Sequence, residues 1–193
     1  MVLGLTGTYC AGKNYVASVL EQRGLPVLDL DAVGHQALES EKESVVRFFG
    51  PGVLWEDATI NRVSLGKLVF ADPEKRALLE RIVHPVVNQR TIQWIEDQPE
   101  SCVINAALLH KSAAFSRLGA IILVEAPVLL RFFRARRRDH LPWKDLMKRF
   151  WSQRHFRSQY FSSNADVYIM GNGFLHRKKI DLRVDEILLA VGL

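Results

Sequence analysis

The stretch from Gly7 to Lys13 combines the residue types and the spacing that bind phosphate groups. Its letters, GTYCAGK, match the pattern GxxxxGK, in which consecutive backbone N–H groups surround an anion. Glycines let the backbone turn tightly at both ends of the loop, and Lys13 supplies positive charge for the outer phosphates of a nucleotide. The residues predicted to contact ATP are Gly7, Thr8, Tyr9, Cys10, Ala11, Gly12, Lys13, Asn14 and Tyr15.

One position of this loop departs from the usual pattern. A hydroxyl residue normally follows the lysine and contacts Mg²⁺, whereas this chain has Asn14 there. The side-chain carbonyl of asparagine can still ligate Mg²⁺, directly or through a water molecule. We therefore predict that Asn14 contacts the metal and that activity is reduced rather than absent.

The segments on either side of the loop place it between a strand and a helix. The apolar run 2–6 predicts a buried strand, and residues 14–23 predict a helix that stops before Gly24. A second short strand over 27–31 completes a strand, helix, strand unit of the kind that forms parallel sheets. The flanks therefore favour a phosphate loop over the alternative, an ordinary glycine turn with a surface lysine.

Two acidic residues end the second predicted strand. Asp29 and Asp31 are two residues apart, so in an extended chain their carboxylates leave the same face. At the carboxyl edge of a parallel sheet such a group can take a proton from an attacking hydroxyl or hold Mg²⁺ through water. Asp29 is equally suited to cap a helix that begins near Ala32, whereas Asp31 is favoured as the functional acid.

Three later runs complete a predicted sheet. They lie at 101–106, 119–125 and 166–170, and the first two do not alternate between apolar and polar residues. Strands of that kind are covered by helices on both faces. A final helix is predicted over 181–191. The sequence therefore predicts an α/β fold of three layers, with a five-stranded parallel sheet, in a single domain over 1–193.

Residues 40–99 are predicted to form a helical insertion between the second and third strands. His84-Pro85 is expected to break one of its helices. Arg62 is a candidate anion ligand and His84 a candidate pocket residue, although a lone arginine or histidine is more often structural. The helices are expected at 44–49, 62–70 with Asn61 as cap, 72–83, and from Pro85 to about Glu96.

The region 131–160 is rich in basic residues. Residues 131–157 contain ten Lys or Arg against two Asp. Arg131, Arg134 and Arg138 are spaced to share one face of a helix that opens at Pro127, and a further helix is expected over 143–160. A patch of this kind fits nucleic acid or a lid over a nucleotide, and the phosphate loop favours the lid.

The composition limits the alternatives. The chain has 193 residues, of which 48% are hydrophobic, and a formal net charge of +5. No apolar run reaches the length that spans a bilayer, and two cysteines are too few for a disulfide framework. We expect a cytoplasmic protein with no membrane or nucleic-acid partner.

The order of several motifs resembles the dephospho-CoA kinases, which transfer the γ-phosphate of ATP to the ribose 3′-hydroxyl of dephospho-CoA. GLTG followed by GK resembles that family's GLTGGIGSGKS, and VLDLDA resembles its V-I-D-A-D segment. The likeness covers nearly the whole chain. Further stretches follow in the family's order: INRVSL, VF, DPE, the pair HP at 84–85, Arg149 with Gln153, and AD at 165–166 with NG at 172–173.

The resemblance implies roles for particular residues. Asp31 would be the general base on the 3′-hydroxyl, and Lys13 would hold the β and γ phosphates. Arg134 and Arg138 would be lid arginines that reach the phosphates, Arg138 as a catalytic residue. Asn172 would lie near the adenine. The implied ligands are ATP, Mg²⁺ held with the help of Asp31, and dephospho-CoA; the oligomeric state is left open.

The acceptor side of the resemblance is less complete. Asp29, Arg62 and His84 would bind dephospho-CoA together with Asp31. The family often has PLLFE after its third strand, whereas this chain has ALLHK, which puts Lys111 where an acid is expected. Two alternatives follow: a related kinase for another small acceptor such as a nucleoside monophosphate, or a weakly active nucleotide-binding protein.

Overall fold

The computed structural model describes residues 1–139, 142–153, 156–161, 165–173 and 177–193. The contacts between residues divide the chain into two compact units. The first unit combines Met1–Leu28 with Asp97–Leu193, and the second is Asp29–Glu96. Most of the predicted helical insertion, 40–99, falls within the second unit, which begins earlier than the insertion.

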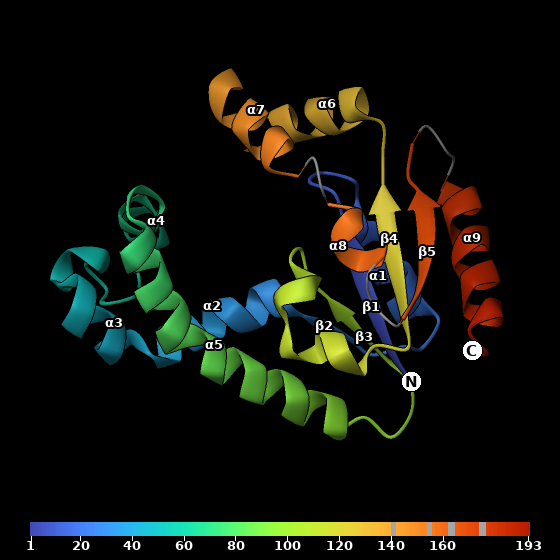
Figure 1. The fold of residues 1–193 in the computed structure, drawn as a ribbon, viewed down its shortest axis with the longest axis horizontal. Coiled ribbons are helices and arrows are strands. Elements are labelled where there is room, and N and C mark those ends of the chain that lie inside the picture. Colours follow the sequence, from blue (N-terminus) through green and yellow to red (C-terminus); the bar gives the residue numbers. More distant parts are fainter. Residues whose placement is uncertain (140–141, 154–155, 162–164, 174–176) are drawn as a thin grey trace. The chain divides into compact units, whose positions relative to one another are not determined.

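A five-stranded parallel sheet forms the centre of the first unit (Figure 1). Its strand order is β2-β3-β1-β4-β5, so the strand before the phosphate loop, β1, is central. β3 and β4 are buried along nearly their whole length, as expected of strands with helices on both faces. The predicted α/β sheet is therefore confirmed. The strands are β1 (Val2–Gly7), β2 (Val27–Asp29), β3 (Cys102–Asn105), β4 (Ala120–Glu125) and β5 (Asp166–Gly171).

Different elements cover the two faces of this sheet. On one face, α1 (Lys13–Gln22) and α9 (Arg177–Ala190) share a buried core with Leu3 and Leu5 of β1. On the other, a Cβ atom added at Gly4 would lie 2.6 Å from a methyl carbon of Leu109, so the chain approaches closely there. That face is covered by η2 (Leu109–Lys111), η3 (Ala113–Arg117) and α8 (Ser158–Phe161). α6 (Val128–Asp139) and α7 (Trp143–Ser152) follow β4.

Tyr160 of α8 joins these covering elements to the sheet. Its hydroxyl lies 3.2 Å from the hydroxyl of Thr6 in β1 and 3.2 Å from Nδ1 of His110. The His110 and Tyr160 rings also meet edge to face at 5.6 Å. His110, one of the residues that depart from the family's motif, therefore packs against α8, whereas the neighbouring Lys111 is exposed.

His110 makes the stability of the fold depend on pH. Burial, with a smaller contribution from Lys111, lowers the pKa of His110 below its ordinary value, so the folded state favours the neutral ring. This contribution to the free energy of unfolding is complete above about pH 6.5 and is lost as the pH falls through the folded-state pKa. Urea unfolding at pH 7.5 and 5.5 should show less pH dependence for His110→Asn than for the wild type. If the free energy of unfolding changed by the same amount between these two pH values in both proteins, His110 would not be the source of the pH dependence.

The second unit is helical and has its own core. It contains α2 (Leu30–Ser40), α3 (Lys42–Phe49), η1 (Pro51–Val53), α4 (Arg62–Ala71) and α5 (Pro73–Glu96). The side-chain oxygen of Asn61 accepts a hydrogen bond from the backbone N–H of Ser64, which confirms Asn61 as the cap of α4. The buried residues of this core are Leu38, Val45, Val53, Ile60, Leu65 and Val69.

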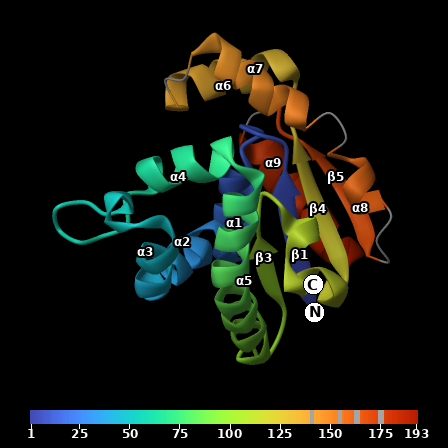
Figure 2. The same ribbon diagram turned by 60° about the vertical axis from the view of Figure 1, so that its left-hand side comes forward.

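The predicted helix break at His84-Pro85 is wrong. α5 runs through Pro85 as one helix of 24 residues (Figure 2). Proline in a helix interior removes one backbone hydrogen bond and costs about 3 kcal/mol. α5 packs against α2, α3 and α4, and the apolar contacts with these helices offset that cost.

Three other boundaries differ from the prediction. β2 ends at Asp29 rather than residue 31, because α2 begins at Leu30. The helix expected over 143–160 ends at Ser152, and α8 is a separate short helix; residues 154–155 between them lie outside the described residues. The final helix begins at Arg177, four residues earlier than expected.

Candidate active site

The phosphate loop connects β1 to α1 and is fixed by backbone hydrogen bonds. The N–H of Thr8 donates to the carbonyl oxygen of Val124 in β4 at 3.1 Å, and the N–H of Ala11 donates to Thr8 O at 2.9 Å. Cys10 and Gly12 have φ angles of 59° and 93°, both in the left-handed region. Left-handed residues between right-handed ones turn successive N–H groups toward one point, where an anion binds. α1 then begins at Lys13, so its N-terminal N–H groups face the same loop.

Glycine is required at the end of the loop because Asn172 occupies the adjacent space. A Cβ atom at Gly12 would lie 2.2 Å from Nδ2 of Asn172. Asn172 is buried, donates from Nδ2 to the carbonyl oxygen of Ala11 at 2.8 Å, and donates its N–H to Glu125 O at 2.6 Å. Asn172 therefore supports the phosphate loop, and its contact with the adenine stays a prediction.

We expect Gly12→Ala to weaken ATP binding and to destabilise the protein. The variant must hold alanine at a positive φ, which costs about 1–3 kcal/mol, and must displace the Asn172 amide. Gly34→Ala is a matched control, because a Cβ atom at Gly34 in α2 meets nothing within 4 Å. That control should gain about 0.5–1 kcal/mol in stability. Thermal unfolding and ATP calorimetry measure both effects; unchanged ATP affinity in Gly12→Ala would refute the requirement.

Two buried oxygens at this edge of the sheet suit a bound nucleotide and metal. Thr8 Oγ1 and Asn105 Oδ1 are buried and have no hydrogen-bond partner among the described residues. Asn105 is the last residue of β3, is 3% exposed, and pairs with Leu5 of β1 just before the phosphate loop. Buried oxygens of this kind normally find a partner, so the site has unused acceptors next to the loop. The loop and these oxygens therefore fit a phosphate group with its hydrated metal ion.

Asn105 is not among the residues that the sequence motifs predict for the site. The available signal was a polar residue at the carboxyl end of a strand that is otherwise apolar, next to the phosphate-loop strand. Among the described residues there is no group of three or more His, Cys, Asp or Glu that could hold a metal ion.

Two arginines of α6, Arg131 and Arg134, contact the backbone of the phosphate loop. Arg131 is 8% exposed and donates from Nε to the carbonyl oxygen of Tyr9 at 2.8 Å. Arg134 donates to Ala11 O at 3.1 Å and to Asn172 O at 3.3 Å. Burial lowers the pKa of Arg131. These two guanidiniums therefore hold the loop backbone, and the contact of Arg134 with phosphate stays a prediction.

A second group of charges surrounds the Tyr9 side chain. Arg138 donates to Asp139 at 2.7 and 3.2 Å, and Arg149 lies 3.5 Å from the same carboxylate. The Tyr9 hydroxyl also donates to Asp139. The hydrogen bonds from Arg138 are the main reason why the pKa of Asp139 is lowered. Burial acts in the opposite direction, and the hydrogen bond from the Tyr9 hydroxyl lowers the pKa further. Arg138 is thus held beside the loop, whereas the involvement of Asp139 was not foreseen.

Asp29 and Asp31 do not share one face of a strand, which corrects the prediction. Asp29 is the N-cap of α2, and its Oδ1 accepts the backbone N–H of Asp31 at 2.9 Å. Asp31 lies in the first helical turn and is exposed. The capping interpretation of Asp29 is therefore confirmed, because a helix begins two residues earlier than expected. Asp31 as the functional acid stays a prediction.

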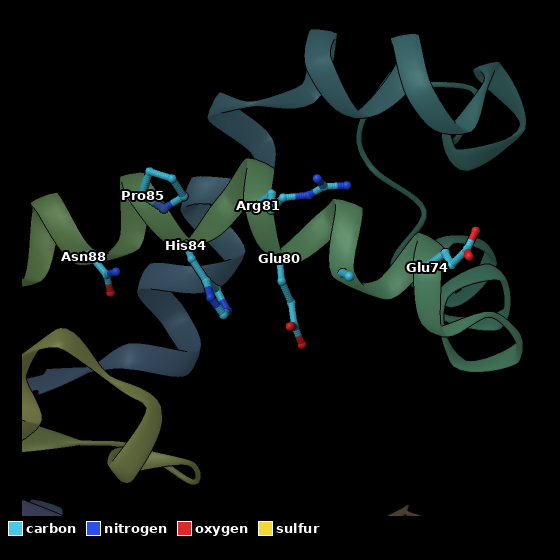
Figure 3. A pocket seen from close by; sticks show the side chains of 7 residues that line it. Glu74, Glu80, Arg81, His84, Pro85 and Asn88 are labelled. Carbon is cyan, nitrogen blue, oxygen red and sulfur yellow. The ribbon is translucent and has the colours of Figure 1, made fainter.

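The other two predicted acceptor residues line separate hollows of the second unit. Arg62 lies with His35, Glu39 and Trp55 around a hollow of about 480 Å³. His84 lines a hollow of about 1000 Å³, where it projects from the same side of α5 as Glu80 and Asn88 (Figure 3). Arg62 and His84 therefore line different hollows in the described part of the second unit.

No helix among the described residues has both the length and the apolar character needed to cross a membrane.

Comparisons with known proteins point to one family. A family model described as dephospho-CoA kinase matches residues 1–176. A dephospho-CoA kinase of Halalkalibacterium halodurans is 34% identical over 189 residues, which cover 94% of this chain and 93% of that protein. A solved protein of Thermus thermophilus superposes with a TM-score of 0.83 at 27% identity, covering 100% of this chain and 98% of that one. The structure of a Campylobacter jejuni dephospho-CoA kinase shares the fold, with a TM-score of 0.73 at 20% identity over 98% and 96% of the two chains. This chain belongs to the dephospho-CoA kinase family.

Proposed function

We propose that this protein phosphorylates the ribose 3′-hydroxyl of dephospho-CoA with ATP, giving coenzyme A and ADP. The observation that carries the proposal is a phosphate loop backed by arginines of α6, in a chain of this family. The family assignment favours this acceptor over the alternatives considered from the sequence. Phosphoryl transfer needs little covalent chemistry from the protein, so positioning and charge neutralisation supply most of the rate acceleration.

In this mechanism the N–H groups of the loop and Lys13 bind the β and γ phosphates. Asp31 takes the proton from the 3′-hydroxyl as the oxygen attacks the γ-phosphorus, and ADP leaves with the bridging oxygen. Arg138 and Arg134 belong to a lid over the phosphates, residues 131–160. Asp29, Arg62 and His84 belong to an acceptor-binding region within residues 40–99. These assignments follow from the sequence motifs.

The proposed metal contacts are Asn14, Asp31 and Asn105. Magnesium supplies positive charge to the transferring phosphoryl group when it is bound with ATP. Asn14 offers a neutral amide oxygen where P-loop enzymes have a hydroxyl, and Asn105 offers another at the carboxyl end of β3. Two neutral amides make a weaker magnesium site, so reduced activity is the expected consequence of this pair.

The variant Asn105→Leu shows whether Asn105 contacts the metal or only supports the fold. Replacing an unpartnered buried amide by an apolar side chain should leave the melting temperature unchanged or higher. If Asn105 supports the metal, the Mg²⁺-dependent part of the ATP affinity should fall about tenfold. Calorimetric titration of ATP with and without Mg²⁺ measures this directly. A Mg²⁺ effect identical to that of the wild type would remove Asn105 from the site.

A panel of acceptors tests the proposed function. Purified protein with Mg²⁺ and ATP is assayed for ADP release with dephospho-CoA, a nucleoside monophosphate or no acceptor. We expect ADP release to depend on dephospho-CoA. Turnover only with the nucleoside monophosphate, or ATP binding without turnover on any acceptor, would contradict the proposal.

A further inference from the structure

Tyr9 is the point at which the phosphate loop meets the charged residues of α6 and α7. The guanidinium carbons of Arg138 and Arg149 lie 5.3 and 5.5 Å from the centre of its ring. Its hydroxyl donates to Asp139 and accepts from Arg149 Nη1 at 3.4 Å. Its ring also meets that of Phe150 edge to face at 5.6 Å. One side chain of the loop therefore contacts both guanidiniums and the carboxylate between them.

The backbone of Tyr9 is held independently of its side chain. Its N–H donates to Oε1 of Gln153 at 2.7 Å, and its carbonyl oxygen accepts Nε of Arg131 at 2.8 Å. Gln153 Oε1 also accepts Arg131 Nη2 at 3.3 Å. A substitution at Tyr9 keeps all three of these hydrogen bonds. Side-chain variants therefore change the surroundings of Arg138 and Arg149 while the loop stays attached to Arg131 and Gln153.

Arg138 and Arg149 need such a partner because both are largely solvent-exposed. Their side chains are 61% and 53% exposed, whereas that of Asp139 is 17% exposed. An arginine side chain loses rotamer entropy when it is ordered. Burial and the hydrogen bond to Asp139 raise the pKa of Tyr9, so its hydroxyl stays a donor at neutral pH. The single carboxylate leaves the trio of Arg138, Arg149 and Asp139 with a net positive charge beside the loop.

We propose that Tyr9 is a positioning residue for phosphoryl transfer, which holds Arg138 and Arg149 in order beside the phosphate loop before the nucleotide binds. The ring supplies a face for both cations, and the hydroxyl fixes the carboxylate that they share. Positioned positive charge lowers the barrier most when no energy is spent on ordering it at the moment of reaction. This inference rests on the proposed kinase function.

Two substitutions separate the effect of the Tyr9 ring on kcat from that of its hydroxyl. Tyr9→Phe keeps the ring and removes the hydroxyl, and kcat should fall about fivefold. Tyr9→Ile introduces the isoleucine that the resembled motif has at this position. This variant loses both the ring contacts with the two arginines and the hydrogen bonds of the hydroxyl. We expect kcat to fall about thirtyfold in this variant, with the KM for dephospho-CoA changed less than threefold. Tyr168→Phe in β5 is the matched control and should behave as the wild type.

A double-mutant cycle tests whether Tyr9 acts through Arg149. Arg149→Gln should lower kcat about tenfold in the wild type. It should have less than a threefold effect in Tyr9→Ile, because the guanidinium has then lost the ring and the hydroxyl that orient it. Independent effects that multiply in the double variant would overturn the proposal, since a merely structural role of Tyr9 predicts that result.

The Nε–H resonances of Arg138 and Arg149 report their position without any turnover. In substrate-free protein, resonances assigned with Arg→Lys variants should show a ring-current shift that persists in Tyr168→Phe and disappears in Tyr9→Ile. Resonances unaffected by Tyr9→Ile, or a lost shift with kcat unchanged, would overturn the role of Tyr9. A wild type that binds ATP but does not phosphorylate dephospho-CoA would instead overturn the proposed function, whatever the resonances show.

Discussion

Asp31→Asn is expected to lower kcat by about 10²–10⁴-fold, the usual contribution of a general base. The substitution keeps the size of the side chain and removes its ability to accept the proton of the 3′-hydroxyl. Only the backbone N–H of Asp31 bonds to Asp29, so the start of α2 is preserved. The affinity for ATP without Mg²⁺, measured by calorimetry, should change little, because Asp31 acts on the acceptor and the metal rather than on the nucleotide itself.

Asp29→Asn provides the matched control for this prediction. Asparagine caps helices about as well as aspartate, so the hydrogen bond to the N–H of residue 31 survives. The control should keep its stability and lose far less kcat than Asp31→Asn. Equal losses in the two variants would mean that α2 is disturbed or that Asp31 is not the base.

Lys13→Met is expected to lower kcat/KM for ATP by about 10²–10³-fold, the effect of removing one preorganised donor to developing charge. Methionine keeps much of the length of lysine and loses its charge. Lys13 is the first residue of α1, so its ammonium group adds to the positive end of that helix. ATP binding should weaken as well, since the charge contacts the phosphates in the ground state.

The exposed Lys178 of α9 offers a comparison for the loss of one positive charge. Lys178→Met should keep the wild-type kcat/KM for ATP at low ionic strength. Lys13→Met with normal ATP affinity and normal turnover would show that the loop binds phosphate through its backbone alone.

The sheet could be predicted because its strands are specified locally. Val2–Gly7 and Ala120–Glu125 are continuous apolar runs that are buried on both faces, and such runs carry the same signal wherever they occur in a chain. The helix after the phosphate loop was equally clear from the spacing of Val16, Val19 and Leu20, which are buried against the sheet. Local pattern and tertiary packing agree in these segments.

The wrong predictions of secondary structure lie where a segment contains signals for two different structures. Asp29 ends the apolar run of β2 and is also a good capping residue, so α2 begins directly after it. At Pro85 a helix-breaking residue lies within a helix that packs along three others. The burial that decides such cases depends on residues far away in the sequence, so no pattern in the segment itself reveals it.

The sequence motif predicts the phosphate loop, but it does not predict the distant residues that hold the loop in place. Cys10 has a φ of 59°, a conformation for which the resembled motif has glycine. Asp139 lies 130 residues from Tyr9 in the sequence, and Asn172 lies 161 residues from Ala11. Partners at such separations are selected by the strand order of the sheet, which places β4 next to β1 and β5 next to β4.

The position of the transferred phosphate distinguishes phosphorylation of the ribose 3′-hydroxyl from every other reaction of ATP. The product of a reaction with ATP, Mg²⁺ and dephospho-CoA is isolated, and its phosphorus–proton couplings are measured by NMR. We predict one new monophosphate resonance coupled to the ribose H3′, in an amount equal to the ADP released. Coupling to H2′, phosphate elsewhere on the acceptor, or ADP formed without any phosphorylated product would contradict the account.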